Sequence, residues 1–226
     1  MNEPGGVDPR QVVRVSSPTH RVRVIAEQRD DVAIEGKATA RQVGATLSVD
    51  GVRGAIRVRV PIGSDVQVGT DSSRVEVHGA VGHLAIVTSS GRVEAETAET
   101  ADIRTASGRV EMGSVNGEAC IRSTSGRVHV GACDGLDVAT ETGRIEVHEA
   151  RGPVQVHCVN GRVEVEMARP ADVDAETVTG RIEVALPPGT KVFRPAEGEG
   201  PGDRPLNHDC TVTARSVSGR VVVSTT

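Results

Sequence analysis

The chain of 226 residues has a formal net charge of -5, with 26 basic and 31 acidic residues interspersed along it. This mixture excludes the basic face that a nucleic-acid partner requires. Phe193 is the single Phe, and Tyr and Trp do not occur. A core must therefore consist of Val, Ile, Leu and Ala, and a cleft that stacks sugars or bases on aromatic rings is not expected.

Residues 1–11 are polar and rich in Gly and Pro, and we expect them to form a disordered leader. They contain no apolar stretch typical of a signal peptide, and no run of about 18 apolar residues occurs anywhere in the chain. We therefore expect a cytoplasmic protein without membrane insertion. The cysteines follow no metal-like spacing, so free thiols and no metal or cofactor are predicted; they are Cys120, Cys133, Cys158 and Cys210.

Residues 12–60 alternate between apolar and polar side chains in short runs, as in Val13–Val15 and Ile56–Val60. Turn residues such as Asp50 and Gly51 separate the runs. Alternation with a period of two residues predicts short strands joined by turns. Because the spacing differs from that of the later chain, this segment is expected to be a β-structured N-terminal cap.

From residue 61 to 226 a single phrase recurs, of the form Thr-x-Ser/Thr-Gly-Arg-Val/Ile-Glu-Val. Successive arginines from Arg74 to Arg181 are 17 to 19 residues apart. A fixed period over this distance is the signature of a stacked repeat. Each unit reads as two short strands and two turns, and glycine at the turns permits the positive φ that a tight reversal needs.

These units predict an all-β fold, a parallel β-solenoid of about eight two-strand coils stacked roughly 4.8 Å apart. One inward column of small apolar residues is expected six residues after each arginine. A segment rich in Pro, Gly and charge interrupts the array at 194–209, and we expect it to be a disordered loop insertion. The small apolar column comprises Ala80, Ala98, Val115, Cys133, Ala150 and Ala168.

The run Ile56-Arg-Val-Arg-Val-Pro61-Ile-Gly63, followed by the iterated Thr-x-Ser-Gly phrase, resembles a bacterial adhesin-like family of β-strand-repeat domains of unknown function. Leu186-Pro187-Pro188-Gly189 is similar to a second copy of the hydrophobic-Pro-x-Gly phrase of that family. The resemblance spans essentially residues 12–226. It implies a β-helix-like fold, and it brings no catalytic or ligand-binding residues.

Arginine and the residue two positions later share the outward face, so the stacked coils should carry an arginine column beside a glutamate column. Such columns are expected to form either a solvated charge lattice, which keeps a sheet soluble, or a strip that binds a polymer or protein ligand. The candidate residues are Arg92, Arg109, Arg127, Arg144, Arg162, Arg181, Glu94, Glu111, Glu146, Glu164 and Glu183.

The last coil ends in Arg220, Val221, Val222 and Val223, without a Pro, an acid or a Lys that would block pairing with another strand. The sequence therefore predicts a non-enzymatic scaffold or interaction module that self-associates, or pairs with a partner's strand, through this C-terminal edge. An adhesin-like binder of a polymer or protein ligand along the Arg/Glu face is the alternative. A polysaccharide-active β-helix enzyme is a more remote one, because sugar-stacking aromatic residues are missing.

Overall fold

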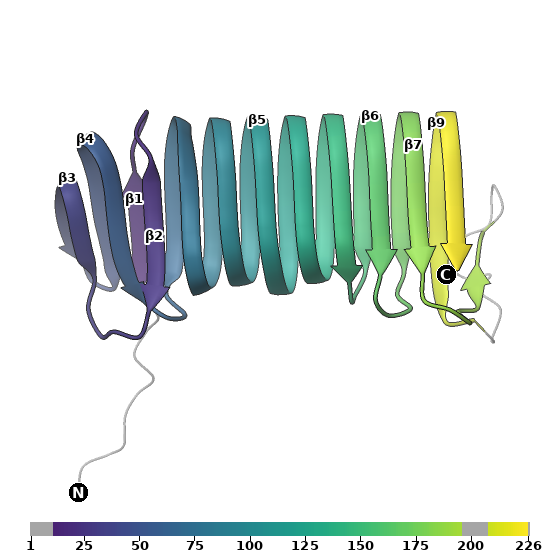
Figure 1. The fold of residues 1–226 in the computed structure, drawn as a ribbon, viewed down its shortest axis with the longest axis horizontal. Coiled ribbons are helices and arrows are strands. Elements are labelled where there is room, and N and C mark those ends of the chain that lie inside the picture. The colour runs from purple at the N-terminus through teal and green to yellow at the C-terminus, as the bar shows by residue number, and fades with distance from the viewer. Residues whose placement is uncertain (1–10, 196–207, 226) are drawn as a thin grey trace, which may run out of the picture.

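The computed structural model describes residues 11–195 and 208–225, and its described part consists of nine strands and no helix (Figure 1). The expected leader at 1–11, except for residue 11, and most of the expected insertion at 194–209 lie outside the described residues. The prediction of an all-β parallel solenoid is confirmed. The strands are β1 (Val12–Ser16), β2 (Val22–Glu27), β3 (Ala33–Val43), β4 (Thr46–Pro61), β5 (Asp65–Ala150), β6 (Val154–Met167), β7 (Val173–Leu186), β8 (Val192–Phe193) and β9 (Cys210–Thr225).

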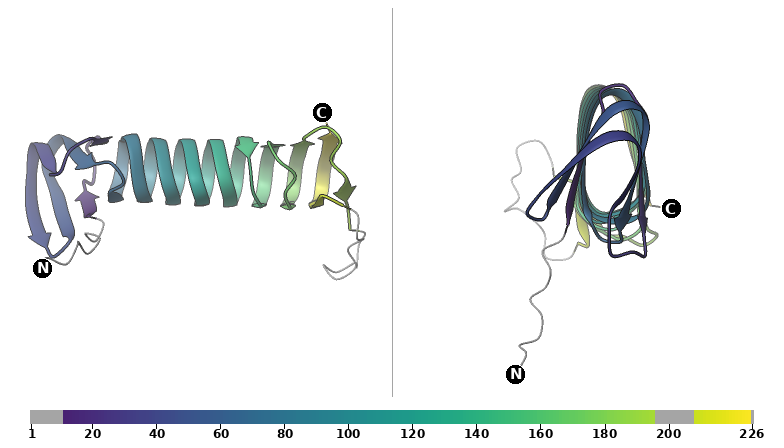
Figure 2. Two further views of the ribbon diagram at one scale, coloured as in Figure 1. Left: turned by 90° about the horizontal axis from the view of Figure 1, so that it is seen from below. Right: turned by 90° about the vertical axis from the view of Figure 1, so that its left-hand side faces the viewer.

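Strand β5 is one ribbon of 86 residues that winds through five successive coils, and β6, β7 and β9 each add one more. Neighbouring coils pair in parallel with equivalent residues side by side; Gly143, Gly161, Gly180 and Gly219, for example, form one row. The result is a straight rod with a flattened cross-section (Figure 2). Each position of the repeat therefore becomes a column that runs along the rod.

The N-terminal residues do not follow the chain order in space. Strands β1 and β2 form a coil that pairs in parallel with β4 on one side and with the first coil of β5 on the other. The segment 12–27 is thus inserted between two coils that are joined directly to each other by residues 62–64. Residues 46–61 and 12–27 are themselves coils of the solenoid, so strand pairing is continuous from β4 to β9.

Strand β3 closes the N-terminal end of the rod. It runs antiparallel to β4, and its register shifts twice, between Glu35 and Lys37 and between Lys37 and Ala38. Ile34 and Ala38 pack against the core from this side. Bulges and charged side chains prevent an edge strand from pairing further, and the outer edge of β3 carries both.

The core is a thin layer of Val, Ile, Leu and Ala between the two faces of the coil. The expected small apolar column is buried at Ala98, Val115, Cys133 and Ala150. At the two ends of this column the expectation is wrong: Val81 and Met167 are buried, whereas Ala80 is half-buried and Ala168 is exposed. Gly79 at φ +81° shifts the alternation by one residue, and β6 ends at Met167 ahead of a loop.

Candidate functional site

The corner that precedes each repeat arginine is fixed by a hydroxyl and a glycine. The Thr88 hydroxyl donates to the Ser90 carbonyl at 2.9 Å, and Thr105 repeats this bond to Ser107 at 3.1 Å. Gly108 follows at φ +142°, and a Cβ there would lie 2.1 Å from the carbonyl oxygen of Gly91 in the preceding coil. Glycine is required both by its conformation and by the close stacking of coils. The next residue, arginine, consequently has the same outward position in every coil.

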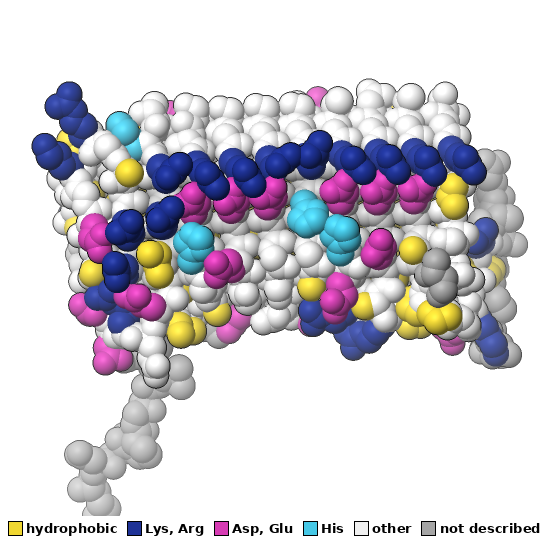
Figure 3. Space-filling model, in the orientation of Figure 1, with side chains coloured by type: hydrophobic (Ala, Val, Ile, Leu, Met, Phe, Trp, Pro, Cys, Tyr) yellow, Lys and Arg dark blue, Asp and Glu magenta, His cyan; other side chains and the backbone are white. Residues whose placement is uncertain are grey.

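The arginines form a continuous row along one face of the rod, with a row of glutamates beside it (Figure 3). We call these two rows the Arg/Glu ladder. Arg92 shows the pattern: it pairs with Glu94 of its own strand and, at 2.6 Å, with Glu111 of the next coil. Arg144 does the same with Glu146 at 2.5 Å and Glu164 at 3.3 Å. The ladder thus crosslinks neighbouring coils.

Further ladder members follow this arrangement. Arg162 pairs with Glu164 and with Glu183 of the next coil, while Arg181 pairs with Glu183 of its own strand. Arg74 pairs at 2.8 Å with both Glu76 and Glu94. The sequence therefore predicted correctly that these side chains share one face.

The ladder holds the carboxyl group of Glu111 in the ionised form. The hydrogen bond from Arg92 lowers the pKa of Glu111, against the opposing effect of burial, and the charges of Arg92 and Arg109 add to the lowering. In return, Glu111 raises the pKa of Arg92. The ion pairs show that most ladder guanidinium groups already have a carboxylate partner within the chain.

The ladder is interrupted at one interior coil, where His129 occupies the glutamate position. Arg109 retains a pair with Glu111 at 3.3 Å, and no ion pair of Arg127 is found among the described residues. The His129 ring lies 4.9 Å from the ring of His148 between centroids. Its Nδ1 is 3.6 Å from a Glu146 carboxylate oxygen. The cyan side chains in the middle of Figure 3 mark this interruption.

A hollow of ≈ 550 Å³ adjoins the interruption. Gly113 and Gly131 lie in it, in the column where other coils carry Glu96, His148 and Glu166. A Cβ on either glycine would approach the backbone of the preceding coil to 2.5 and 2.4 Å, respectively. The backbone therefore keeps this hollow open. The repeat pattern alone did not predict this hollow, although His129 among the glutamates was its visible signal.

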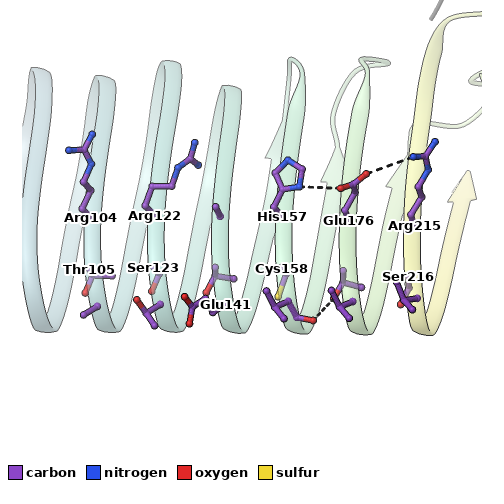
Figure 4. Close-up of a pocket in the computed structure, with 18 of the residues that line it drawn as sticks. Arg104, Thr105, Arg122, Ser123, Glu141, His157, Cys158, Glu176, Arg215 and Ser216 are labelled. Atoms are coloured by element: carbon purple, nitrogen blue, oxygen red, sulfur yellow. Dashed lines mark hydrogen bonds and ion pairs between the residues drawn. The ribbon is translucent and has the colours of Figure 1, made fainter. Parts of the chain in front are cut away.

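A larger groove of ≈ 1470 Å³ lies on another face of the rod. It runs along the corner that contains the Thr hydroxyls, such as those of Thr88 and Thr105. Figure 4 shows its polar row: His157 Nδ1 lies 3.4 Å from Glu176, and Arg215 lies 3.9 Å from the same carboxylate. Its apolar row was not predicted, because alternation alone does not tell how far a corner residue projects. This row consists of Val159, Val178 and Val217, exposed by 44%, 48% and 84% and located at equivalent positions of β6, β7 and β9.

The C-terminal edge of the rod is β9. On its outer side, β8 pairs with the first two residues only, Cys210 and Thr211, and Arg194 Nη2 donates to the Val223 carbonyl at 3.2 Å. Further along, Val221 is 38% exposed, whereas Ile182, its neighbour in the same column, is fully buried. Val222 replaces the glutamate of the ladder beside Arg220. The predicted edge residues therefore lie together on the last coil of the described residues.

The thiols are poor candidates for nucleophiles. Burial raises the pKa of Cys133 to about 11, and burial also raises the pKa of Cys120, Cys158 and Cys210. A raised pKa keeps a thiol protonated and unreactive. Across residues 11–195 and 208–225, no group of three or more His, Cys, Asp or Glu side chains is arranged to hold a metal ion. The same residues contain no helix able to cross a membrane.

The stacked two-strand coils, the glycine corner and the Arg/Glu ladder define a short parallel β-solenoid protein. The chain belongs to the Toastrack DUF4097 family, whose model matches residues 11–223. This is a β-strand-repeat domain of unknown function, and membership in it does not by itself show an adhesin-like role. No curated protein and no solved structure shows significant similarity to the chain.

Proposed function

We propose that the protein is a non-enzymatic interaction module whose docking surface is the open coil end formed by β9. The observation that carries this proposal is the exposure of core positions at that end. Val221 continues the fully buried column of Ile182, yet more than a third of its surface is exposed. An edge strand with unpaired backbone groups is a template for strand addition. The exposed Val217 adds apolar surface directly beside it.

The partner most compatible with this end is a second copy of the chain. The opposite end of the rod is covered by β3, whose bulges and charges oppose pairing, so head-to-tail stacking is disfavoured. Two copies can instead meet through β9 with their strands antiparallel. Such an isologous contact uses the same surface on both chains and therefore stops at two. The proposal is a closed dimer rather than a filament.

A ligand along the whole Arg/Glu ladder is the competing function, and the ion pairs argue against it over most of the rod. Guanidinium groups that already hold one or two carboxylates have few donors left for a polymer. Interspersed glutamates would also repel an anionic chain. The interruption at His129 is the exception, because Arg127 has no ion pair there among the described residues.

The test is the molar mass by light scattering over a hundredfold range of concentration. We expect the wild-type chain to approach twice its mass of 23.5 kDa and then to level off. Val222→Lys should keep the mass at that of one chain without unfolding the rod, because a charge at the edge opposes pairing. The matched control is Val43→Lys at the other end, where the valine is 64% exposed. Equal masses for the wild type and Val222→Lys would refute the proposal.

A further inference from the structure

The ordinary coils of the repeat serve as a reference, because they show which side chains the Arg/Glu ladder needs for stability alone. A coil that differs from them is a candidate for a functional site. In the ordinary coils a glutamate lies between two arginines and pairs with both, as Glu94 does with Arg74 and Arg92. The coil with His129 departs from this pattern although it lies in the interior of the rod. A departure at one position of a regular lattice is the kind of local inconsistency that marks function.

Because of His129, the guanidinium groups of Arg109 and Arg127 lack the glutamate that lies between two arginines in the ordinary coils. Arg127 has no ion pair among the described residues, and Arg109 has only the 3.3 Å contact with Glu111. The two arginines lie on adjacent coils, roughly 4.8 Å apart at strand spacing, so their like charges repel. In the ordinary coils the intervening carboxylate removes this repulsion. An anion from outside the chain would remove it here.

Other carboxylates near the hollow are engaged elsewhere. Glu96 accepts a hydrogen bond from the Gly79 amide at 2.8 Å and lies at the same distance from His78 Nδ1. The hydrogen bond from the Gly79 amide is the main cause of the lowered pKa of Glu96. Glu146 lies 2.5 Å from Arg144, and it also lies 3.6 Å from His129 Nδ1 at the rim of the hollow. These groups are therefore oriented toward their own partners, and Arg127 keeps free donors.

The hollow beside these donors is concave and has a floor of backbone atoms. Gly113 and Gly131 provide it, and the close approach of the preceding coil excludes a side chain at either position. Its ≈ 550 Å³ lies within the roughly 300–1,000 Å³ of ordinary ligand pockets and exceeds the size of a bare phosphate ion. Guanidinium forks bind phosphate oxygens in a bidentate manner, and imidazole adds a further donor.

From this geometry we infer a binding site for the phosphate group of a small phosphorylated compound, formed by Arg109, Arg127 and His129 above Gly113 and Gly131. The phosphate takes the position that a glutamate side chain occupies in neighbouring coils. The remainder of the compound lies over the two glycines. The site is independent of the C-terminal edge and is present in a single chain.

The test uses the full chain with inorganic phosphate and glycerol 3-phosphate as probes, at constant ionic strength set with chloride. Binding is followed by calorimetry and by the histidine ring signals in NMR spectra. We expect both probes to shift the His129 signals, with the ester bound at least as tightly as the free ion. Arg127→Gln should weaken binding about tenfold, the loss typical of one charged hydrogen-bonding partner.

His129→Glu is the sharper variant, because it restores the pattern of the repeat. The new carboxylate should pair with Arg109 and Arg127, abolish phosphate binding, and leave the melting temperature unchanged or higher. As a control, Glu164→His interrupts the ladder where no glycine hollow exists, and it should create no second site. Phosphate binding that is absent in the wild type, undiminished in His129→Glu, or reproduced by chloride would overturn the inference, as would exclusion of the ester.

Discussion

The two ends of the rod differ in how the terminal strand and its core layer are covered. Every solenoid leaves an unpaired strand and an exposed core layer at each end. At the N-terminal end, β3 pairs with β4 in antiparallel orientation and places Ile34 opposite Val58, which is fully buried. At the C-terminal end, β8 pairs with Cys210 and Thr211 of β9, Arg194 donates to the Val223 carbonyl, and Val221 stays 38% exposed.

The uncovered C-terminal coil is therefore not a general consequence of the repeat. The same chain builds a charged, bulged cover at one end, so the fold can accommodate a cap. The ladder follows the same asymmetry: Arg23 extends it to β2 through a 2.7 Å bond to Glu76, whereas Val222 ends it beside Arg220. An uncovered coil end with an apolar edge is typical of a surface that meets a partner.

The largest change in the mass of the assemblies should come from detaching β3 from the N-terminal end of the rod. Gly36 in β3 has φ +121°, and a Cβ there would lie 2.7 Å from the Ala55 carbonyl oxygen. Gly36→Val should therefore detach β3 from β4, at a cost of about 1–3 kcal/mol in local strain. With two open ends, we expect assemblies longer than a dimer. Light scattering and negative-stain images would show a mass that climbs with concentration.

The control for this change is Gly135→Ala in the middle of the rod. A Cβ at Gly135 would come no closer than 3.8 Å to Glu118, so the substitution should be tolerated without altering the mass. If Gly36→Val formed the same assemblies as the wild type, β3 would not be what closes the N-terminal end.

A second prediction compares one core column inside the rod and at its end. Ile182→Ala removes a fully buried side chain and should lower the free energy of unfolding by about 2–5 kcal/mol. Val221→Ala should cost about 1 kcal/mol or less in dilute solution, because the side chain is already partly exposed. Urea unfolding at low and high protein concentration would measure both. The cost of Val221→Ala should rise with concentration, because the dimer buries this position; a cost that is independent of concentration would count against the dimer.

Acid should weaken the N-terminal coils through Glu76. Burial works to raise the pKa of this carboxyl group, but the hydrogen bond and charge of Arg23, with the charges of Arg74 and Arg21, outweigh it and lower the pKa. A lowered pKa means that the stabilisation is complete above the ordinary pKa of glutamate and is lost as the pH falls below it. Glu76→Gln should flatten the acid limb of the stability curve. An unchanged pH dependence of thermal unfolding in this variant would contradict the assignment.

The smallest effect is expected along the regular part of the ladder. Arg162→Ala removes pairs with Glu164 and Glu183 that are about one-quarter to two-fifths exposed. Such pairs contribute about 0–1 kcal/mol each. Thermal unfolding should therefore shift by only a few degrees, and light scattering should show an unchanged mass. A loss as large as that of Ile182→Ala would show that the ladder, rather than the core, holds the coils together.

The sequence predicted what depends on the period and missed what depends on the ends. Regular spacing of the Gly-Arg phrase sufficed for the solenoid and for the common face of Arg92 and Glu94, because both follow from stacking identical units. It could not show that 12–27 lies between β4 and β5, since those segments lack the phrase and pair over long range. Nor could it show the hollow at Gly113, which depends on how closely two coils approach.

The most direct test of the central claim is amide hydrogen exchange as a function of protein concentration. If β9 pairs with a second copy, amides in Cys210–Thr225 should exchange more slowly as concentration rises, because new interchain hydrogen bonds protect them. The amides of β3 should be unaffected, because that end is already closed. Exchange in β9 that is the same at every concentration, or protection that appears in β3 instead, would contradict the account.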